Sequence, residues 1–250
     1  MPSSSFKDHF SRHSRDYAAH RPWYPAELFS QLAAVSPQHE RVWDCATGNG
    51  QAALGLVGHF AHVVATDASV SQLLNRREHA RIDYCASLAE APPLAAGSCD
   101  LVTVAQAVHW FQFDRFYAEV RRVLKPGGVI ALWTYAAFRI RPDIDRCVDD
   151  FYAHVVGPFW PPERRYIEAL YRTIPFPFAE LQLPALVLET AWTLEQVMNY
   201  VGTWSAVQRL RDANGADPLP SLRAELEPLW GAPEATHNVS WPLHLRVGRI

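Results

Sequence analysis

A carboxylate, a hydroxyl and two glycines stand close together in one short stretch of the chain. Residues 41–46 read RVWDCA, and Thr47-Gly48-Asn49-Gly50 follow before a small-residue segment with helical spacing. Glycine permits positive φ and the close approach of a ligand, and the start of a helix presents unpaired N–H groups. A simple Asn-Gly hairpin turn is the alternative, but no strand alternation follows. The stretch therefore predicts a strand, a ligand-binding glycine turn and a helix.

Two aspartates narrow the choice of ligand. Gly48, Gly50 and Ala53 also fit the G-x-G-x-x-A fingerprint of dinucleotide-binding turns. Asp44 ends the first strand and faces the turn, where its carboxylate would repel a pyrophosphate and attract an ammonium or a sulfonium. Asp67 ends the next apolar run, where an acid can accept both hydroxyls of a ribose. A ribose, a cation and no phosphate describe S-adenosylmethionine (SAM).

Apolar runs that alternate with helical segments position these residues. This alternation predicts an α/β fold with a doubly wound, mostly parallel sheet. The predicted strands cover residues 41–46, 62–66, 81–85, 100–105 and 129–135. Ligands of such sheets bind beyond the carboxyl ends of the strands, which is where both aspartates fall.

The amino-acid composition of the chain changes after residue 135, where prolines become frequent. We expect helices over roughly 143–155 and 163–172, and we interpret 136–185 as a helical cap inserted after the fifth strand. A capping box at 193–196 begins a further helix. The alternation over 237–249 indicates a last strand at the edge of the sheet.

Four motifs carry a resemblance to a known family. VWDCATGNG, VVATDAS, AGSCDLVTVAQAVHWF and RVLKPGGVIALW resemble, in order and spacing, the class I SAM-dependent methyltransferases of the type 11 group. A weaker likeness, in HSRDYAAHRPWYP, TLEQVMNYVGTWSAV and NVSWPLHLRVGRI, is to proteins related to the trans-aconitate methyltransferases. The resemblance implies a Rossmann-like sheet of seven strands in a single domain, residues 1–250. Its expected parts are an N-terminal arm and lid (1–37), a SAM-binding core (38–135), the cap (136–185) and C-terminal strands and helices that complete the sheet (186–250).

The resemblance also implies which residues bind the cofactor. Tyr17 and Arg21 would belong to the lid, with the Arg21 guanidinium on the methionine carboxylate; alternatively Tyr17 packs and Arg21 is a surface charge. The family often has an Asp where this chain has Leu88, so we expect the backbone at Leu88 and Ala89, or another side chain, to hold the adenine. The expected cofactor residues are Tyr17, Arg21, Asp44, Ala46, Thr47, Gly48, Asn49, Gly50, Asp67, Ala68, Ser69, Leu88, Ala89, Ala105 and Gln106.

The acceptor side is expected just past the fourth strand. His109 and Trp110 follow that strand, and Trp204 and Ser205 lie in a break between two predicted helices. His109 is the candidate catalytic residue, either as a neutral base toward a hydroxyl or as a cation or donor that holds a carboxylate. A structural histidine is the third possibility. The favoured function is methyl transfer to a small molecule, on an oxygen of a carboxylate or a hydroxyl.

The composition of the chain limits which partners, metals and cellular locations we expect. A net charge of −3 without charged blocks argues against nucleic-acid and membrane-surface partners. The four cysteines have no metal-ligand spacing, so no metal is expected. With no apolar leader at the start, we expect a cytoplasmic protein, monomeric or homodimeric. A SAM-binding protein without transferase activity stays open, and Asp44 argues against a nicotinamide-dependent oxidoreductase.

Overall fold

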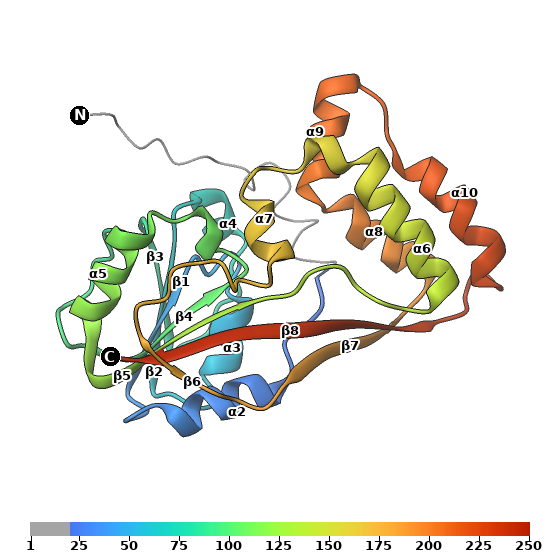
Figure 1. Cartoon of the computed structure of the whole chain (residues 1–250). Coiled ribbons are helices and arrows are strands. Elements are labelled where there is room, and N and C mark those ends of the chain that lie inside the picture. The colour runs from blue at the N-terminus through green and yellow to red at the C-terminus, as the bar shows by residue number, and fades with distance from the viewer. Residues whose placement is uncertain (1–20) are drawn as a thin grey trace.

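The computed structural model describes residues 21–250. Tyr17 and most of the expected lid lie outside the described residues. Five parallel strands form the first part of the sheet, and the chain then adds three strands that pair antiparallel (Figure 1). The strands are β1 (Arg41–Cys45), β2 (His62–Asp67), β3 (Ile82–Ala86), β4 (Cys99–Ala105), β5 (Leu124–Thr134), β6 (Ala179–Leu181), β7 (Leu186–Trp192) and β8 (His237–Arg249).

The order of the strands brings the predicted cofactor residues together at the carboxyl ends of the parallel strands. The sheet runs β3-β2-β1-β4-β5-β8-β6, which is a path of seven strands, and β7 joins as the eighth by pairing with β8. The chain therefore has the expected α/β fold with a mostly parallel, doubly wound sheet. Because β1 lies between β2 and β4, the turns after these three strands are neighbours.

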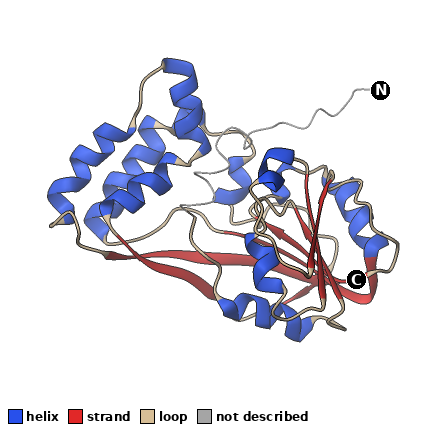
Figure 2. Cartoon of the chain, turned by 180° about the vertical axis from the view of Figure 1, so that it is seen from behind, coloured by secondary structure: helices blue, strands red, loops and turns tan. Residues whose placement is uncertain are grey.

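Helices cover both faces of the parallel strands (Figure 2). Leu28 and Leu32 of α2 and Leu56 of α3 are buried in one core cluster, and Phe116 and Val120 of α5 belong to the other. These amphipathic helices bury their apolar stripes against strands that are apolar on both sides. The helices of the core are α2 (Ala26–Val35), α3 (Gln51–Leu56), α4 (Val70–Leu74), the 3₁₀ turn η2 (Val108–Trp110) and α5 (Phe113–Val123).

Polar side chains stabilise the starts of two helices of the core. The Ser69 side chain accepts the Gln72 N–H at the start of α4, which ends at Leu74. Helix α5 begins after Gln112, and Asp114 lies in its first turn. A carboxylate in the first turn interacts favourably with the helix dipole.

Strand β8 is an interior strand, and the expectation of an edge strand was wrong. Its first half, His237 to Leu243, pairs with β7 and forms a two-stranded ribbon. Its second half, His244 to Arg249, pairs with β5, and the last residues also pair with β6. The alternating pattern shows which side chains are buried, but it contains no information about how many strands lie alongside.

The β7–β8 ribbon leads from the sheet to a separate layer of helices (Figure 1). The expected cap, 136–185, supplies α6 to this layer, but helices from the 186–250 region join it: α10 packs against both α6 and α8. The division of the chain at 185 therefore cuts through one packed group. The elements of this half are α6 (Pro142–Asp150), the π-helical turn η3 (Phe151–Val155), the 3₁₀ turn η4 (Gly157–Phe159), α7 (Arg164–Glu168), α8 (Leu194–Gly202), α9 (Ser205–Asn214) and α10 (Leu219–Trp230).

Local sequence signals fix the start of α8. Thr193 and Gln196 form the predicted capping box, in which each side chain bonds the other residue's backbone N–H. Across residues 21–250, no helix combines the length and the apolar character that a bilayer span requires.

Candidate active site

The turn after β1 has an unusual backbone. Ala46, Gly48 and Gly50 all have positive φ, at 53°, 58° and 85°. The Thr47 N–H donates to the carbonyl of Thr66 at 2.9 Å, which ties this turn to the end of β2. The structure thus confirms the strand, glycine turn and helix predicted from residues 41–57.

Gly48 and Gly50 differ in what surrounds their Cα atoms. A Cβ added to Gly50 would lie 2.0 Å from the Tyr84 hydroxyl oxygen, whereas a Cβ added to Gly48 would meet only Gln72, at 3.9 Å. A side chain at Gly50 would therefore force Tyr84 to move, in addition to straining the backbone at its positive φ. Only Gly48 has the open surroundings that a close ligand approach needs.

Asp67 is held in a fixed orientation at the end of β2. One carboxylate oxygen accepts the Gly48 N–H and the other accepts the Ser69 N–H, each at 2.8 Å. An ionised carboxylate accepts hydrogen bonds at both oxygens. A carboxylate in this place is the kind of group that accepts the hydroxyls of a ribose diol, and Asp67 is partly exposed.

Asp44, near the end of β1, is fully buried. Its oxygens accept the hydroxyls of Thr47 at 2.5 Å and Thr103 at 2.8 Å. Burial raises the pKa of Asp44 to about 6, and these two hydrogen bonds oppose the rise. A nearby ligand cation would favour the ionised form, so the residue suits an ammonium or sulfonium through its charge.

The remaining predicted cofactor residues lie around this turn. The Asn49 carbonyl accepts the Arg77 N–H, and Ser69 is buried at the start of α4. Leu88 has 41% of its surface exposed, whereas Ala89 is buried. Ala68 lies between Asp67 and Ser69, and Ala105 ends β4.

Residues 21–37 are the described part of the expected arm and lid, and two of them contact the region around the turn after β1. The Pro22 carbonyl accepts the Gln51 side chain at 2.8 Å, at the first residue of α3. The Arg77 guanidinium stacks on the Trp23 ring at 4.5 Å.

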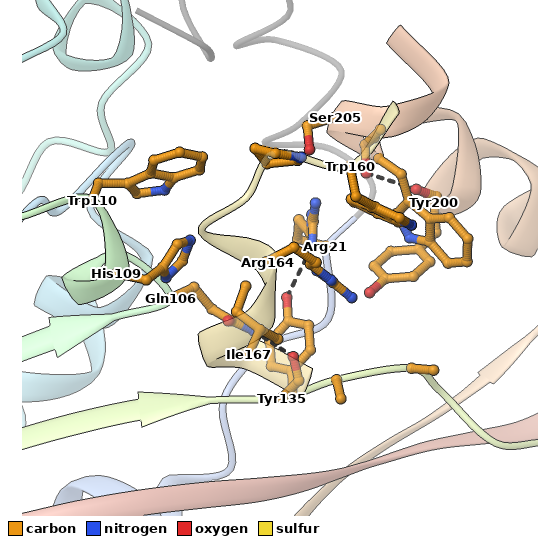
Figure 3. Close-up of a pocket in the computed structure, with 15 residues that line it drawn as sticks. Arg21, Gln106, His109, Trp110, Tyr135, Trp160, Arg164, Ile167, Tyr200 and Ser205 are labelled. Carbon is orange, nitrogen blue, oxygen red and sulfur yellow. Dashed lines mark hydrogen bonds between the residues drawn. The ribbon is translucent and has the colours of Figure 1, made fainter. Parts of the chain in front are cut away.

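A cavity opens beyond the ends of β4 and β5, between the sheet and the helical layer (Figure 3). It encloses about 70 Å³. All four predicted acceptor residues, His109, Trp110, Trp204 and Ser205, line it, together with two residues predicted to bind the cofactor. The lining residues are Arg21, Gln106, His109, Trp110, Tyr135, Ala136, Ala137, Trp160, Pro161, Arg164, Ile167, Tyr200, Thr203, Trp204 and Ser205.

Gln106 connects the cofactor turn to the cavity. It follows β4, next to the end of β1, and has a positive φ of 56°. Its side chain accepts the Thr134 hydroxyl at 2.6 Å and donates to the Tyr135 carbonyl at 3.2 Å. A left-handed backbone costs a non-glycine residue energy, and these bonds stabilise it.

His109 is buried, and its Nδ1 lies 2.9 Å from the Tyr171 hydroxyl. Burial lowers the pKa of His109 to about 3, and the positive charge of Arg164 lowers it further. The imidazole is therefore neutral at physiological pH. This contradicts the cationic form of the carboxylate-holding hypothesis, while a neutral N–H donor remains compatible with the geometry.

Arg21 lies in the cavity wall, pointing toward Tyr135 and Tyr200 (Figure 3). Its Nη1 donates to the Tyr135 hydroxyl at 3.3 Å, and the guanidinium lies 5.0 Å from the centre of the Tyr200 ring. The structure thus places Arg21 among cavity residues instead of leaving it as an isolated surface charge.

Sequence reasoning did not single out several cavity residues, among them Tyr135, Trp160, Arg164 and Tyr200. Tyr135 was predicted only as the end of a strand, and the others lie on helical pieces whose packing no pattern fixes. The run Trp160-Pro-Pro-Glu-Arg-Arg was the available signal, because an arginine close to a tryptophan in the sequence can stack on its ring.

The fold, together with the residues at the carboxyl ends of its parallel strands, defines a class I SAM-dependent methyltransferase. Residues 43–132 match the methyltransferase domain family. A protein of Dictyostelium discoideum named as a methyltransferase is 30% identical over 227 residues, which cover 89% of this chain and 86% of that protein. The chain belongs to the SAM-dependent methyltransferases, and SAM is its cofactor.

Solved structures agree with this assignment. A protein of Anaeromyxobacter dehalogenans described as a type II methyltransferase is 44% identical, with a TM-score of 0.87 over 92% of this chain and 98% of that one. A phosphoethanolamine N-methyltransferase of Haemonchus contortus, solved with S-adenosylhomocysteine, shares the fold at 14% identity and a TM-score of 0.50, over 98% of this chain and 60% of that one.

Proposed function

We propose that this methyltransferase transfers the methyl group of SAM to an oxygen atom, of a carboxylate or a hydroxyl, in a small-molecule acceptor. The observation that carries the proposal is the cavity next to the cofactor turn, whose walls come together from the sheet and the helical layer. Such an enclosed space suits one end of a small molecule better than the surface of a macromolecule. SAM supplies the methyl electrophile when bound, so the protein mainly has to orient the acceptor and exclude water.

We assign the cofactor residues by their chemistry. Asp67 would accept the ribose hydroxyls, Gly48 would allow close approach, and Asp44 would stabilise the positive charge of the cofactor. Leu88 and Ala89 would hold the adenine through backbone and apolar contact. Arg21, with Tyr17 in the proposed lid, would pair with the methionine carboxylate, which the contacts of the described lid residues around the turn support.

The acceptor proposal is tested with the purified full chain, SAM and a panel of phenols, alcohols, carboxylic acids and amines. Formation of S-adenosylhomocysteine is measured, and the methylated product is identified. Turnover confined to oxygen acceptors is the expected result. Transfer to amines alone would contradict the choice of oxygen. SAM binding without any transfer would favour the alternative of a SAM-binding protein that does not act as an enzyme.

The lid proposal has its own measurement. Hydrogen exchange of the segment 6–24 should slow when SAM or S-adenosylhomocysteine binds, because a closed lid protects its amides. Identical exchange with and without ligand would remove the proposed roles of Tyr17 and Arg21.

A further inference from the structure

The charged residues that line the acceptor cavity in the described part of the chain are all positive. Two arginines, Arg21 and Arg164, line it, and the lining set within residues 21–250 contains no aspartate or glutamate. A cavity with cationic walls attracts an anionic ligand. The proposed function already assigns Arg21 to the methionine carboxylate of the cofactor, so Arg164 is the cavity cation that still has no assigned ligand.

Arg164 is oriented without being neutralised. Its Nε donates to the Tyr152 hydroxyl at 2.8 Å, and that hydroxyl donates to Glu168 at 2.8 Å. The guanidinium lies 4.3 Å from the Trp160 ring centre and 5.3 Å from that of Tyr152. These contacts fix one edge and one face of the group. In the described part of the chain, no carboxylate forms an ion pair with Arg164, and its two Nη atoms have no hydrogen-bond partner.

Other arginines show the contrast. Arg139, Arg141 and Arg223 each pair with a carboxylate at 2.6–2.9 Å. An arginine whose Nη atoms are free and whose position is fixed by aromatic stacking is prepared for a planar anion, because its fork matches carboxylate geometry. The Trp160 indole N–H is also buried without a partner among the described residues and lines the same cavity.

The cavity is poor in groups that could remove a proton. His109 is its only described histidine, and burial with the nearby Arg164 charge lowers the pKa of His109 to about 3. A base with that pKa removes a proton from a phenol of pKa about 10 very unfavourably. A carboxylate is already ionised at neutral pH, so its methylation needs no base.

We propose that the acceptor is a small carboxylic acid with a planar apolar body, whose carboxylate pairs with Arg164 and is converted to a methyl ester. The inference rests on the proposed function and specifies its acceptor. The rings of Trp110, Trp160, Trp204 and Tyr200 line the space for the planar body. Two of the four lone-pair positions of the carboxylate accept Arg164, and a remaining lone pair forms the new C–O bond. The electrons of the broken C–S bond stay on sulfur, and no proton is released.

The first test compares acceptors that differ only in charge. The full chain is incubated with SAM and with benzoate, benzamide, benzyl alcohol and phenol, and in parallel with trans-cinnamate and cinnamamide. Binding of each is measured by calorimetry on protein saturated with S-adenosylhomocysteine. We expect the acids to bind about 10- to 100-fold more tightly than the amides and to yield base-labile methyl esters. Equal binding of acid and amide overturns the proposal.

The second test uses neighbouring arginines of α7. Arg164→Gln should raise the acid's Kd and KM about 10- to 100-fold and leave SAM affinity unchanged, and Arg164→Lys should recover part of the loss. Arg165→Gln is the matched control, because Arg165 is exposed and lies outside the cavity lining. Thermal unfolding of each variant shows whether the fold is kept.

The outcomes separate this inference from the proposed function. Transfer to phenol or benzyl alcohol, with Arg164→Gln unchanged, overturns the carboxylate acceptor and keeps oxygen methylation. Loss of SAM affinity in Arg164→Gln, with acid binding intact, assigns Arg164 to the cofactor and overturns the inference. Transfer to amines alone overturns both.

Discussion

The residues proposed to bind the cofactor come from the ends of neighbouring strands, whereas the cavity proposed for the acceptor is lined by five separated segments of the chain. Asp44 lies near the end of β1 and Asp67 is the last residue of β2, two strands that pair directly. The cavity residues lie at 21, 106–110, 135–137, 160–167 and 200–205. The cofactor region therefore depends on backbone geometry that is local, and the cavity depends on how the helical layer packs.

This difference shows where variation is tolerated. A change in the packing of α7 or α8 alters the cavity wall without touching the turn after β1. A change in the turn alters the cofactor site for every acceptor. The following predictions test that separation, from the largest expected effect to the smallest.

Gly50→Ala should destabilise the protein by about 2–5 kcal/mol, because a left-handed backbone and a clash with Tyr84 add together. Gly48→Ala should cost only about 1–2 kcal/mol, since its surroundings are open. Urea unfolding of both variants measures the difference. Equal losses would show that the Tyr84 contact does not constrain the turn.

Asp44→Asn should raise stability near pH 8 in the absence of SAM and weaken SAM binding. Burial raises the pKa of Asp44 from 3.8 to about 6, so the folded protein holds this proton more tightly than the unfolded chain. The stability from this group is complete below about pH 4 and is lost as the pH rises through about 6, a change of about 3 kcal/mol.

Unfolding of wild type and Asp44→Asn between about pH 4.5 and 8 tests this sign. The two curves should differ most at high pH, where the wild type carries a buried charge. A variant that is less stable than wild type at pH 8 would mean that the hydrogen bonds from Thr47 and Thr103 outweigh the cost of burying the charge.

Asp67→Ala should weaken SAM binding by about 1–3 kcal/mol, as expected for lost hydrogen bonds to a charged group. The KM for the acceptor at saturating SAM should stay the same, because Asp67 lies outside the cavity lining. Calorimetry and steady-state kinetics report the two quantities. A change confined to the acceptor KM would contradict the separation of the two regions.

His109 should produce no ionisation step in kcat near pH 6.5. Trp110, Tyr171 and Arg164 surround its ring, and burial with the Arg164 charge holds the pKa at about 3. The kcat profile at saturating SAM should therefore be the same in wild type and His109→Asn from about pH 5.5 to 8.5. A step in the wild type that His109→Asn removes would show that His109 titrates after all.

Sequence reasoning succeeded where one short stretch contains both cause and effect. The glycine turn, the capping box at Thr193 and the bounds of β8 are set by residues adjacent in the chain. It failed on relations between distant segments. Alternation in 237–249 could not show that β8 pairs on both sides, and the isolated helical patterns could not show that α10 packs on α6.

For the candidate site too, local features could be predicted from the sequence and contacts between distant segments could not. Asp44 was predicted from its place at a strand end, but its full burial and its hydrogen bond from Thr103, a residue 59 positions away, could not be predicted. Arg164 was overlooked because a charged residue on a predicted helix is usually solvated. Its stacking on Trp160 arises only when the chain folds.

The interior place of β8 has a consequence for the order in which the chain folds. Strands β5, β6 and β7 all precede β8 in the chain, and all three pair with it. During synthesis the backbone N–H and C=O groups of these three strands that later pair with β8 stay unpaired until β8 has been made. Unpaired edges of this kind invite pairing with other chains, and long-range pairing is slow to form. The parallel strands up to β5 can assemble early, while closure of the sheet and attachment of the ribbon are a late, shared step.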